Sequence, residues 1–323
     1  MANKAVVGAQ DGNEIFVYMG GDQVVPRNVI RVRIDKSVKI IPQSAFYNRR
    51  RLIYVEFHDG IEIVEKHAFN CCTSLRGSIK LLGVKIIGNG AFYNCRDLTD
   101  VEFGDKLETI GRSAFSTCNS LRSVTMPSIR IIEEFAFMLC DKLTDLEFGE
   151  ELETIEESAF KCCDRLRRIA MPLKDDMIGD RVFSFCPNLA TVHLVGGFHR
   201  TVASLHLESW KNEMNEEINR VNQVLPGTHE QEKTPVVQDW MRSVIHRIDH
   251  FKAEHKALLK EATTLLELAL WKANLDDNEG GVLEKEGART TRGRRKRARK
   301  EICVTSGASI VIKNVLPFFT LFE

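Results

Sequence analysis

The chain has 323 residues, 43% of them hydrophobic, and equal numbers of basic and acidic residues, 45 of each. This balance excludes the global basic field of a protein that binds nucleic acid along its whole surface. The N-terminus shows no secretory signal, and no run of about 18–20 apolar residues predicts a membrane span. We therefore expect an intracellular protein of the nucleus or cytoplasm, without membrane contact, whose nine cysteines are thiols.

A phenylalanine marks an internal repeat along the first two thirds of the chain. Its copies are 22 or 23 residues apart, and a leucine follows each copy six residues later. The copies are Phe46, Phe69, Phe92, Phe115, Phe137, Phe160 and Phe183. A unit of this length cannot bury its apolar side chains alone, so neighbouring copies must stack. The spacing predicts an α/β solenoid of about seven 22–23-residue coils, begun by the half repeat VIRVRI at residues 29–34.

Each repeat ends in a strand-like segment, such as LTDVEF at residues 98–103. With a period of two, Val101 and Phe103 point into the core while Asp100 and Glu102 point outward. The residues before the phenylalanine are expected to turn the chain. The A-F-x-x-C segment is expected to form a helical or 3₁₀ turn beneath the sheet.

Cysteine occupies the third position after the phenylalanine in six of the seven repeats. The six are Cys72, Cys95, Cys118, Cys140, Cys163 and Cys186, and Arg49 takes the position in the first repeat. A zinc site needs four converging ligands and a catalytic cysteine is usually single, whereas these thiols would form a column. The column predicts buried, inert thiols, with no metal site and no cofactor. Cys71, Cys162 and Cys303 lie outside it and are the candidates for reactive thiols.

The repeated pattern I-x-x-x-A-F-x-x-C-x-x-L-x-x-V-x-F, with Met-Pro or Phe-Gly at the turn, resembles the BspA-type leucine-rich repeats over residues 29–195. The helical sequence beyond it is similar to the C-terminal extension of an expanded diatom family that carries such repeats. The resemblance implies a curved solenoid with a role in recognition. It implies no catalytic residues.

The outward residues alternate between acidic and less acidic coils, so two coils form a super-repeat of about 45 residues. Duplication of a two-coil unit explains this pattern without a function, and the face is then a solvated polar surface. Alternatively, solenoids bind partners through this face, and the carboxylates near its middle would attract a basic protein. The candidate partner-binding residues are Tyr54, Glu56, Asp100, Glu102, Ser123, Thr125, Asp145 and Glu147.

Helical spacing replaces the repeat after residue 205. One apolar stripe ends at Pro226-Gly227, and Thr234 as N-cap with Pro235 in the first turn opens a second helix of about 40 residues. Its heptad seam comprises Val237, Met241, Val244, Ile248, Phe251, His255, Leu258, Ala262, Leu265 and Ala269. The first helix is too short to cover the seam. Either residues 302–323 or a second chain, in a homodimer through residues 237–273, must cover the far half.

A basic run, RGRRKRARK, follows a linker rich in glycine and glutamate. Its charged residues are Arg292, Arg294, Arg295, Lys296, Arg297, Arg299 and Lys300. Such a run cannot fold on its own. Three interpretations are open: a nuclear localisation signal, a solvated linker, or a patch that binds the phosphates of nucleic acid or acidic lipid.

The sequence predicts a non-catalytic repeat scaffold for protein–protein recognition, with a helical assembly region. The alternative is a nuclear factor that binds nucleic acid through the basic run, and an enzyme ranks third. The expected domains are an N-terminal cap at 1–34, repeats at 35–195, a helical hairpin at 196–275, a disordered basic linker at 276–301 and an apolar C-terminal segment at 302–323.

Overall fold

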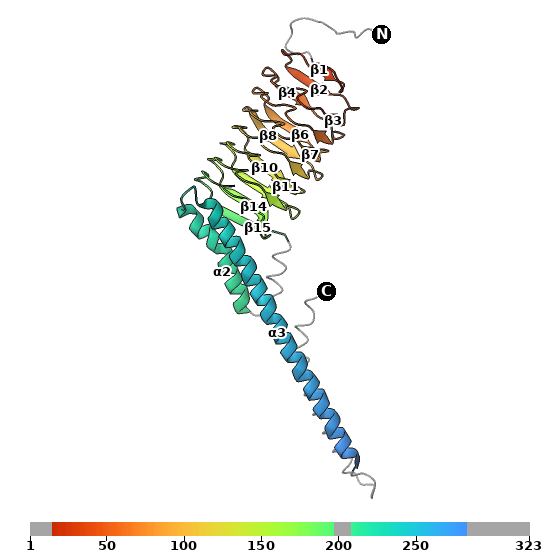
Figure 1. Ribbon diagram of the computed structural model, residues 1–323, viewed down its shortest axis with the longest axis vertical. Coiled ribbons are helices and arrows are strands. Elements are labelled where there is room, and N and C mark those ends of the chain that lie inside the picture. Colours follow the sequence, from red (N-terminus) through yellow and green to blue (C-terminus); the bar gives the residue numbers. More distant parts are fainter. Residues whose placement is uncertain (1–14, 197–207, 283–323) are drawn as a thin grey trace. The chain divides into compact units, whose positions relative to one another are not determined.

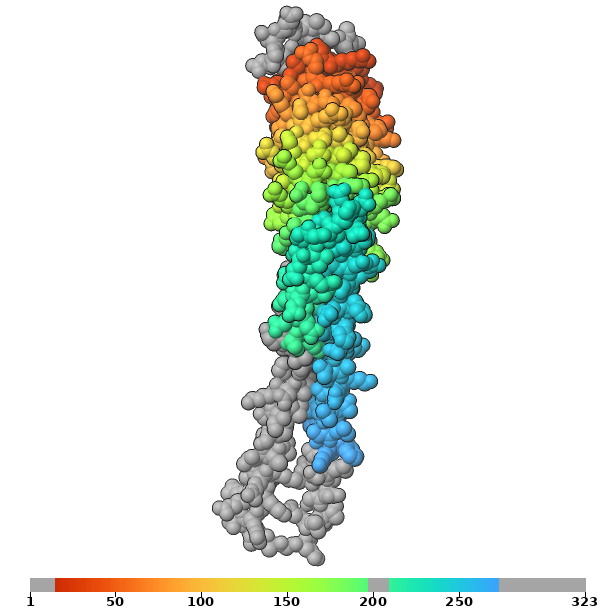
Figure 2. All heavy atoms as spheres, turned by 90° about the vertical axis from the view of Figure 1, so that its left-hand side faces the viewer, coloured from red at the N-terminus to blue at the C-terminus, as the bar shows by residue number. Residues whose placement is uncertain are grey.

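The computed structural model describes residues 15–196 and 208–282, with the side chains of 209–272 in the second range (Figure 1). The chain divides into two compact units, one formed by residues 1–202 and 215–245 and the other by residues 203–214 and 246–323. The first unit contains a solenoid whose coils follow one another in chain order (Figure 2). The solenoid and its C-terminal helices agree with the predicted fold class.

Each coil contributes one strand to a front row of parallel strands. The row consists of β1 (Ile15–Tyr18), β2 (Arg31–Ile34), β4 (Tyr54–Glu56), β6 (Gly77–Leu81), β8 (Leu98–Phe103), β10 (Ser123–Met126), β12 (Asp145–Phe148), β14 (Arg168–Pro172) and β15 (Thr191–Val195). Hydrogen bonding divides it into three sheets, β1-β2-β4, β6-β8 and β10-β12-β14-β15. We call the outward residues of this row the exposed face.

A back row of two-residue strands lies where the sequence predicted only a change of direction. These strands form a continuous six-stranded parallel sheet in the order β13-β11-β9-β7-β5-β3. They are β3 (Ile40–Ile41), β5 (Ile63–Val64), β7 (Ile86–Ile87), β9 (Thr109–Ile110), β11 (Ile131–Ile132) and β13 (Thr154–Ile155). Two apolar residues in each repeat are too short a signal to separate a strand from a turn.

The A-F-x-x-C segment is not the helical or 3₁₀ turn that we expected. Asn94 within it and Gly90 directly before it have left-handed backbone, both with φ 61°. Main-chain N–H groups alternate between two kinds of acceptor: Phe92 donates to Ala114 of the next coil at 2.8 Å, and Tyr93 donates to Gly90 of its own coil at 3.1 Å. The turn thus bonds to its neighbouring coil, which a helix cannot do because its N–H groups point along its own axis.

The core is a stack of the seven repeated phenylalanine rings, all fully buried. Successive ring centroids lie 4.7 to 6.3 Å apart, within the range of favourable aromatic stacking. Coils this close require glycine at one turn position. A Cβ atom on Gly104 would lie 1.9 Å from the carbonyl oxygen of Leu82, so no other residue fits between the coils there.

Two helices and a short 3₁₀ turn follow the last coil: α2 (Glu208–Val224), η1 (Leu225–Gly227) and α3 (Lys233–Val282). Within the first unit they supply hydrogen bonds that a further coil would otherwise give. The side-chain amide of Asn222 binds both the N–H and the carbonyl of Val192 in β15. The main-chain N–H of Phe183 donates to the hydroxyl of Thr234 at 2.8 Å. These contacts pair the last edge of the stack, which would otherwise invite aggregation.

Three details of the predicted helices are wrong. Thr234 is not the N-cap, because α3 begins at Lys233 and the hydroxyl of Thr234 serves Phe183 instead. The second helix is longer than the predicted 40 residues, at 50. The predicted boundary between hairpin and linker at residues 275–276 lies inside α3. Gly280 and Gly281 both lie within α3, which the structure describes as far as Val282.

The heptad seam of α3 is buried only along its first part. In the second unit, Trp210 of α2 stacks on Phe251 with ring centroids 5.0 Å apart, and His255 is buried. Farther along, Leu258 and Leu265 are exposed, as is Trp271. The far half of the seam therefore lacks the cover that α2 gives to the first.

Candidate functional site

The candidate partner-binding residues lie on the exposed face, in the alternation that the sequence predicted. Glu102, Thr125 and Glu147 are exposed, whereas Val101 and Leu146 are buried beneath them. Parallel pairing places Thr125 of β10 beside Glu147 of β12. The predicted residues thus form one continuous surface across the coils.

Basic residues of neighbouring coils pair with several carboxylates of this face. Arg33 pairs with Glu56 at 2.8 Å, Lys80 with Glu102 at 2.7 Å, and Arg168 with Asp145 at 3.0 Å. Among the described residues, Asp100 and Glu147 have no ion-pair partner. Exposed ion pairs contribute little and exchange readily, so the face is less negative than the acidic residues alone indicate.

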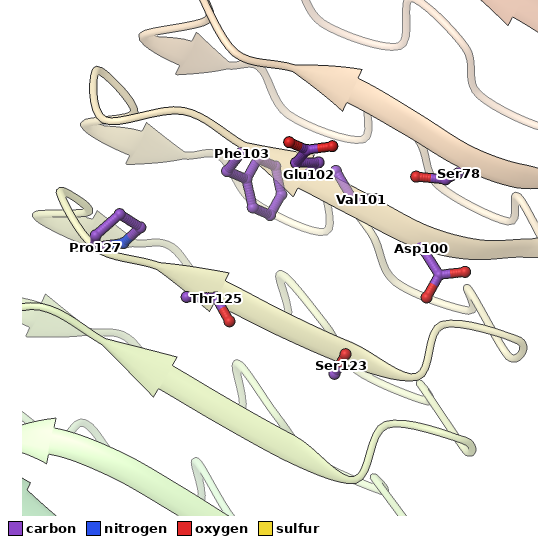
Figure 3. A pocket seen from close by; sticks show the side chains of 8 residues that line it. All are labelled: Ser78, Asp100, Val101, Glu102, Phe103, Ser123, Thr125 and Pro127. Atoms are coloured by element: carbon purple, nitrogen blue, oxygen red, sulfur yellow. The ribbon is translucent and has the colours of Figure 1, made fainter.

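The front row is open between β8 and β10, near the middle of this face (Figure 3). The last main-chain hydrogen bond there runs from Arg122 N–H to Thr99 carbonyl, at 3.1 Å. Beyond it, in the described part of the chain, no hydrogen bond joins Asp100–Phe103 to Ser123–Met126. The phenylalanine stack and the back row stay regular beneath the opening, since Phe92 and Phe115 remain 5.1 Å apart. The coils therefore separate only at the front.

The strand-end phenylalanines of alternate coils pack against the phenylalanine stack of the next coil. The ring of Phe103 packs edge-on against Phe115 of the next coil at 5.9 Å, and the ring of Phe57 is tilted against Phe69 at 5.5 Å. The front row is open at both of these junctions, β8/β10 and β4/β6. Coils that end in Leu81 or Met126 stay paired to the next coil. Phe148 also packs on Phe160, at 6.0 Å, yet β12 and β14 are paired, so the ring alone does not open a junction.

A hollow of about 370 Å³ lies over the opening. Its lining joins carboxylates and hydroxyls to a small apolar surface: Ser78, Asp100, Val101, Glu102, Phe103, Ser123, Thr125 and Pro127. The sequence predicted four of these residues as partner-binding and missed the hollow itself.

The cysteine column is structural, as the sequence predicted. All six thiols are fully buried, and each donates a hydrogen bond to the phenylalanine carbonyl of the preceding coil, at 3.1 to 3.3 Å. Burial raises the pKa of Cys118 to about 12, which keeps it protonated and unreactive at neutral pH. In the first coil, Arg49 donates instead to the carbonyl of Val25. The column thus ties each coil to the one before it.

A family model for the "BspA type Leucine rich repeat region" matches residues 26–127 and 85–204, which together exceed half of the chain. The chain belongs to the BspA-type leucine-rich-repeat family. Proteins with this repeat are scaffolds that commonly take part in protein interactions. The match covers the coils and leaves α3 outside the repeat region.

Solved structures similar to this leucine-rich-repeat protein come from bacteria. A leucine-rich-repeat protein of Treponema pallidum is 22% identical, with a TM-score of 0.46, over 62% of this chain and 92% of that one. A leucine-rich cell surface protein of Faecalibacterium prausnitzii is 27% identical, with a TM-score of 0.42, over 55% and 48%. A Bacteroides ovatus protein is 24% identical, with a TM-score of 0.36, over 51% and 55%. The chain spans about half the length of the last two, and none of the curated proteins compared with it matches significantly.

Within 15–196 and 208–282, no group of histidine, cysteine or acidic side chains is arranged to hold a metal ion. The same residues include no helix of the length and apolarity that a membrane span requires. Cys303, the basic run at 292–300 and the segment at 302–323 lie outside the described residues.

Proposed function

We propose that this BspA-type leucine-rich-repeat chain is a non-catalytic scaffold that binds a protein partner through its exposed face. The opening between β8 and β10 supports the proposal most directly. It is one of two interruptions of the front row, and two carboxylates, three hydroxyls and an apolar surface meet there. A recognition surface needs such a mixture of shape and polar groups at its centre.

The charges of this face favour a partner with a basic segment. Asp100 and Glu147 carry unpaired charge among the described residues, and the ion pairs of Glu102 and Asp145 can exchange for contacts with a partner. Charge complementarity of this kind raises association rate and specificity more than affinity. The neutral strand β10, with Ser123 and Thr125, lies between the two acidic strands.

The experiment is capture from a cell extract by the intact chain and by a variant that changes Asp100, Glu102, Asp145 and Glu147 to Lys. A partner identified with the intact chain is then purified and its affinity for both proteins is measured. We expect the variant to lose binding while keeping its melting temperature, because exposed substitutions cost within about 0.5 kcal/mol each. Binding that survives all four changes would move the recognition site away from this face.

We propose further that α3 is an assembly region through which two chains form a homodimer. The exposed seam residues Leu258 and Leu265 continue the heptad positions that α2 covers earlier in the helix. The alternative to a homodimer is that residues 302–323 of the same chain cover the exposed part of the seam. Sedimentation of the full chain distinguishes a dimer from a monomer.

A second candidate function rests on seven basic residues within RGRRKRARK at 292–300. A run of this charge would direct the chain to the nucleus or bind the phosphates of a nucleic acid. Binding of DNA or RNA through it would weaken steeply with salt and vanish on deletion of 292–300. A fluorescent fusion in which Arg294, Arg295, Lys296 and Arg297 are alanine tests import, because an import signal lost in this way disperses the fusion from the nucleus.

A further inference from the structure

The opening between β8 and β10 leaves main-chain groups of two strands without their usual ladder partners. In the closed junction between β10 and β12, residues Ser123 to Met126 pair in register with Asp145 to Phe148. The same residues of β10 make no such bonds toward β8. Carbonyl oxygens along this edge are therefore available to a ligand in addition to the side chains.

Side chains around the opening are rich in hydrogen-bond acceptors. Asp100 and Glu102 supply carboxylates from β8, and Ser123 and Thr125 supply hydroxyls from β10 (Figure 3). No basic side chain lines the hollow. Lys80 of β6 pairs with Glu102 at 2.7 Å. A ligand that donates several hydrogen bonds and carries positive charge fits this lining, whereas an anion does not.

Apolar groups beside the acceptors narrow the choice of cation. Val101 and Phe103 remain 7% and 8% exposed at the opening, compared with 2% for Val124 and 0% for Met126. Pro127 completes this apolar part of the lining. A guanidinium group is flat, donates five N–H groups in one plane and stacks on apolar and aromatic surfaces. A lysine ammonium group is more strongly hydrated and gains less from contact with the apolar surface of the hollow.

The width of the opening also excludes insertion of a whole strand. The coils on either side stay in contact through the stacked rings of Phe92 and Phe115, 5.1 Å apart, and through the thiol of Cys118, which reaches the Phe92 carbonyl. An inserted strand would need about twice the usual spacing of 4.7–4.9 Å between β8 and β10. A single planar side chain needs much less.

We propose that the hollow between β8 and β10 binds an arginine side chain of the protein partner. This inference rests on the proposed function and adds the chemistry of the contact. The guanidinium lies over the opening, donates to Asp100 and Glu102 and to the hydroxyls of β10, and rests on Phe103.

The test uses N-acetyl-arginine amide as the probe and the full chain labelled with ¹³C at threonine methyl groups. Thr125 reports on the hollow, and Thr154 of the back row is the internal reference. N-acetyl-citrulline amide has nearly the same shape as the arginine probe but no charge. N-acetyl-lysine amide carries the positive charge but has no planar guanidinium group. We expect the Thr125 signal to shift saturably with the arginine probe, less with lysine and least with citrulline.

Two double variants remove the same number of negative charges from different places on the exposed face. They distinguish binding in the hollow from general attraction to the negative charge of the exposed face. Asp100→Asn with Glu102→Gln should weaken arginine binding about tenfold, because charge-assisted hydrogen bonds are lost. Asp145→Asn with Glu147→Gln, on the closed junction, should change it little. Phe103→Leu should also reduce the Thr125 shift, because the guanidinium loses the aromatic ring on which it rests. Unchanged melting temperatures for the exposed variants verify that each is folded.

The proposal is overturned if Thr154 shifts as much as Thr125, if citrulline binds as well as arginine, or if both double variants weaken binding equally. These results concern the arginine contact alone. Partner capture that depends on the exposed face without an arginine preference would contradict this inference and keep the proposed function. Arginine binding at Thr125, with partner capture unaffected by the four-carboxylate reversal, would contradict the proposed function instead.

Discussion

The ammonium group of Lys233 donates a hydrogen bond to the carbonyl oxygen of Leu189, 2.8 Å away. It donates a second one to the carbonyl of Leu225, and the side chain is fully buried. Leu189 belongs to the last coil, and Leu225 begins the turn between α2 and α3. One lysine thus joins the end of the repeat stack to the helices that cap it. Desolvation lowers the pKa of Lys233, which shows that burying the charged form has a cost. The two hydrogen bonds to the carbonyls offset that cost.

Replacing Lys233 with Met should lower the free energy of unfolding by roughly 2 kcal/mol, because two buried carbonyls lose their charged donor. The decrease in the free energy of unfolding is limited because the substitution also removes the cost of burying the charged ammonium group. Urea unfolding measures the change. Lys256→Met, at an exposed position of the same helix, is the control and should be nearly neutral. Equal effects of the two changes would show that Lys233 is not a capping residue.

Native thiol labelling should separate the cysteine column from its neighbours. In a chain with Cys303→Ser, a thiol reagent should modify only the half-buried Cys71 and Cys162 in the native state and the six column thiols after unfolding. Partial burial raises the pKa of Cys162, which slows its reaction. Mass spectrometry of the labelled peptides identifies the sites. Rapid labelling of Cys95 or Cys118 in the folded chain would contradict the core assignment.

Alkaline pH should destabilise the fold through the same column. Burial raises the pKa of Cys72 and Cys118 to about 12 and that of Cys95, Cys140 and Cys163 well above the usual value. A raised pKa favours the protonated thiol in the folded state. The contribution of these thiols to the free energy of unfolding is therefore fully present below about pH 8.5, the pKa of a cysteine thiol in the unfolded chain. Above that pH the free energy of unfolding falls by roughly 1.4 kcal/mol per pH unit for each thiol.

Urea midpoints between pH 8 and pH 10 measure this slope. The variant Cys118→Ala should start less stable, because it leaves a cavity, but lose less stability per pH unit than the intact chain. Cys71→Ala, outside the column, should keep the full slope. The same slope in all three proteins would assign the alkaline loss to other groups.

Dimerisation through α3 should depend on its exposed seam. Changing Leu258 and Leu265 to Glu should convert the dimer to a monomer in sedimentation, because a dimer would bury both side chains. Lys256→Glu with Lys260→Glu alters exposed positions on other sides of the same helix and should leave the dimer intact. A monomer already in the unaltered chain would leave residues 302–323 as the cover of the seam.

The repeat length and the inward positions could be predicted because each coil repeats the same requirement. Phe92 and Cys95 recur at fixed places since every ring and thiol must meet its neighbour in the next coil. The helical turn was predicted wrongly because local spacing does not reveal that alternate N–H groups bond to another coil. The opening at β8 was missed because it concerns hydrogen bonding between neighbouring coils, which the pattern within one repeat does not reveal.

Photocrosslinking from the exposed face tests the central claim most directly. A photoreactive residue is placed at Glu147, beside Thr125 on the exposed face, and in a separate protein at Glu108, which is exposed next to the back row. Each is irradiated with the purified partner obtained by capture. Crosslinking from Glu147 and none from Glu108 is the result that we predict. Crosslinking from Glu108 with none from Glu147 would contradict recognition through the exposed face.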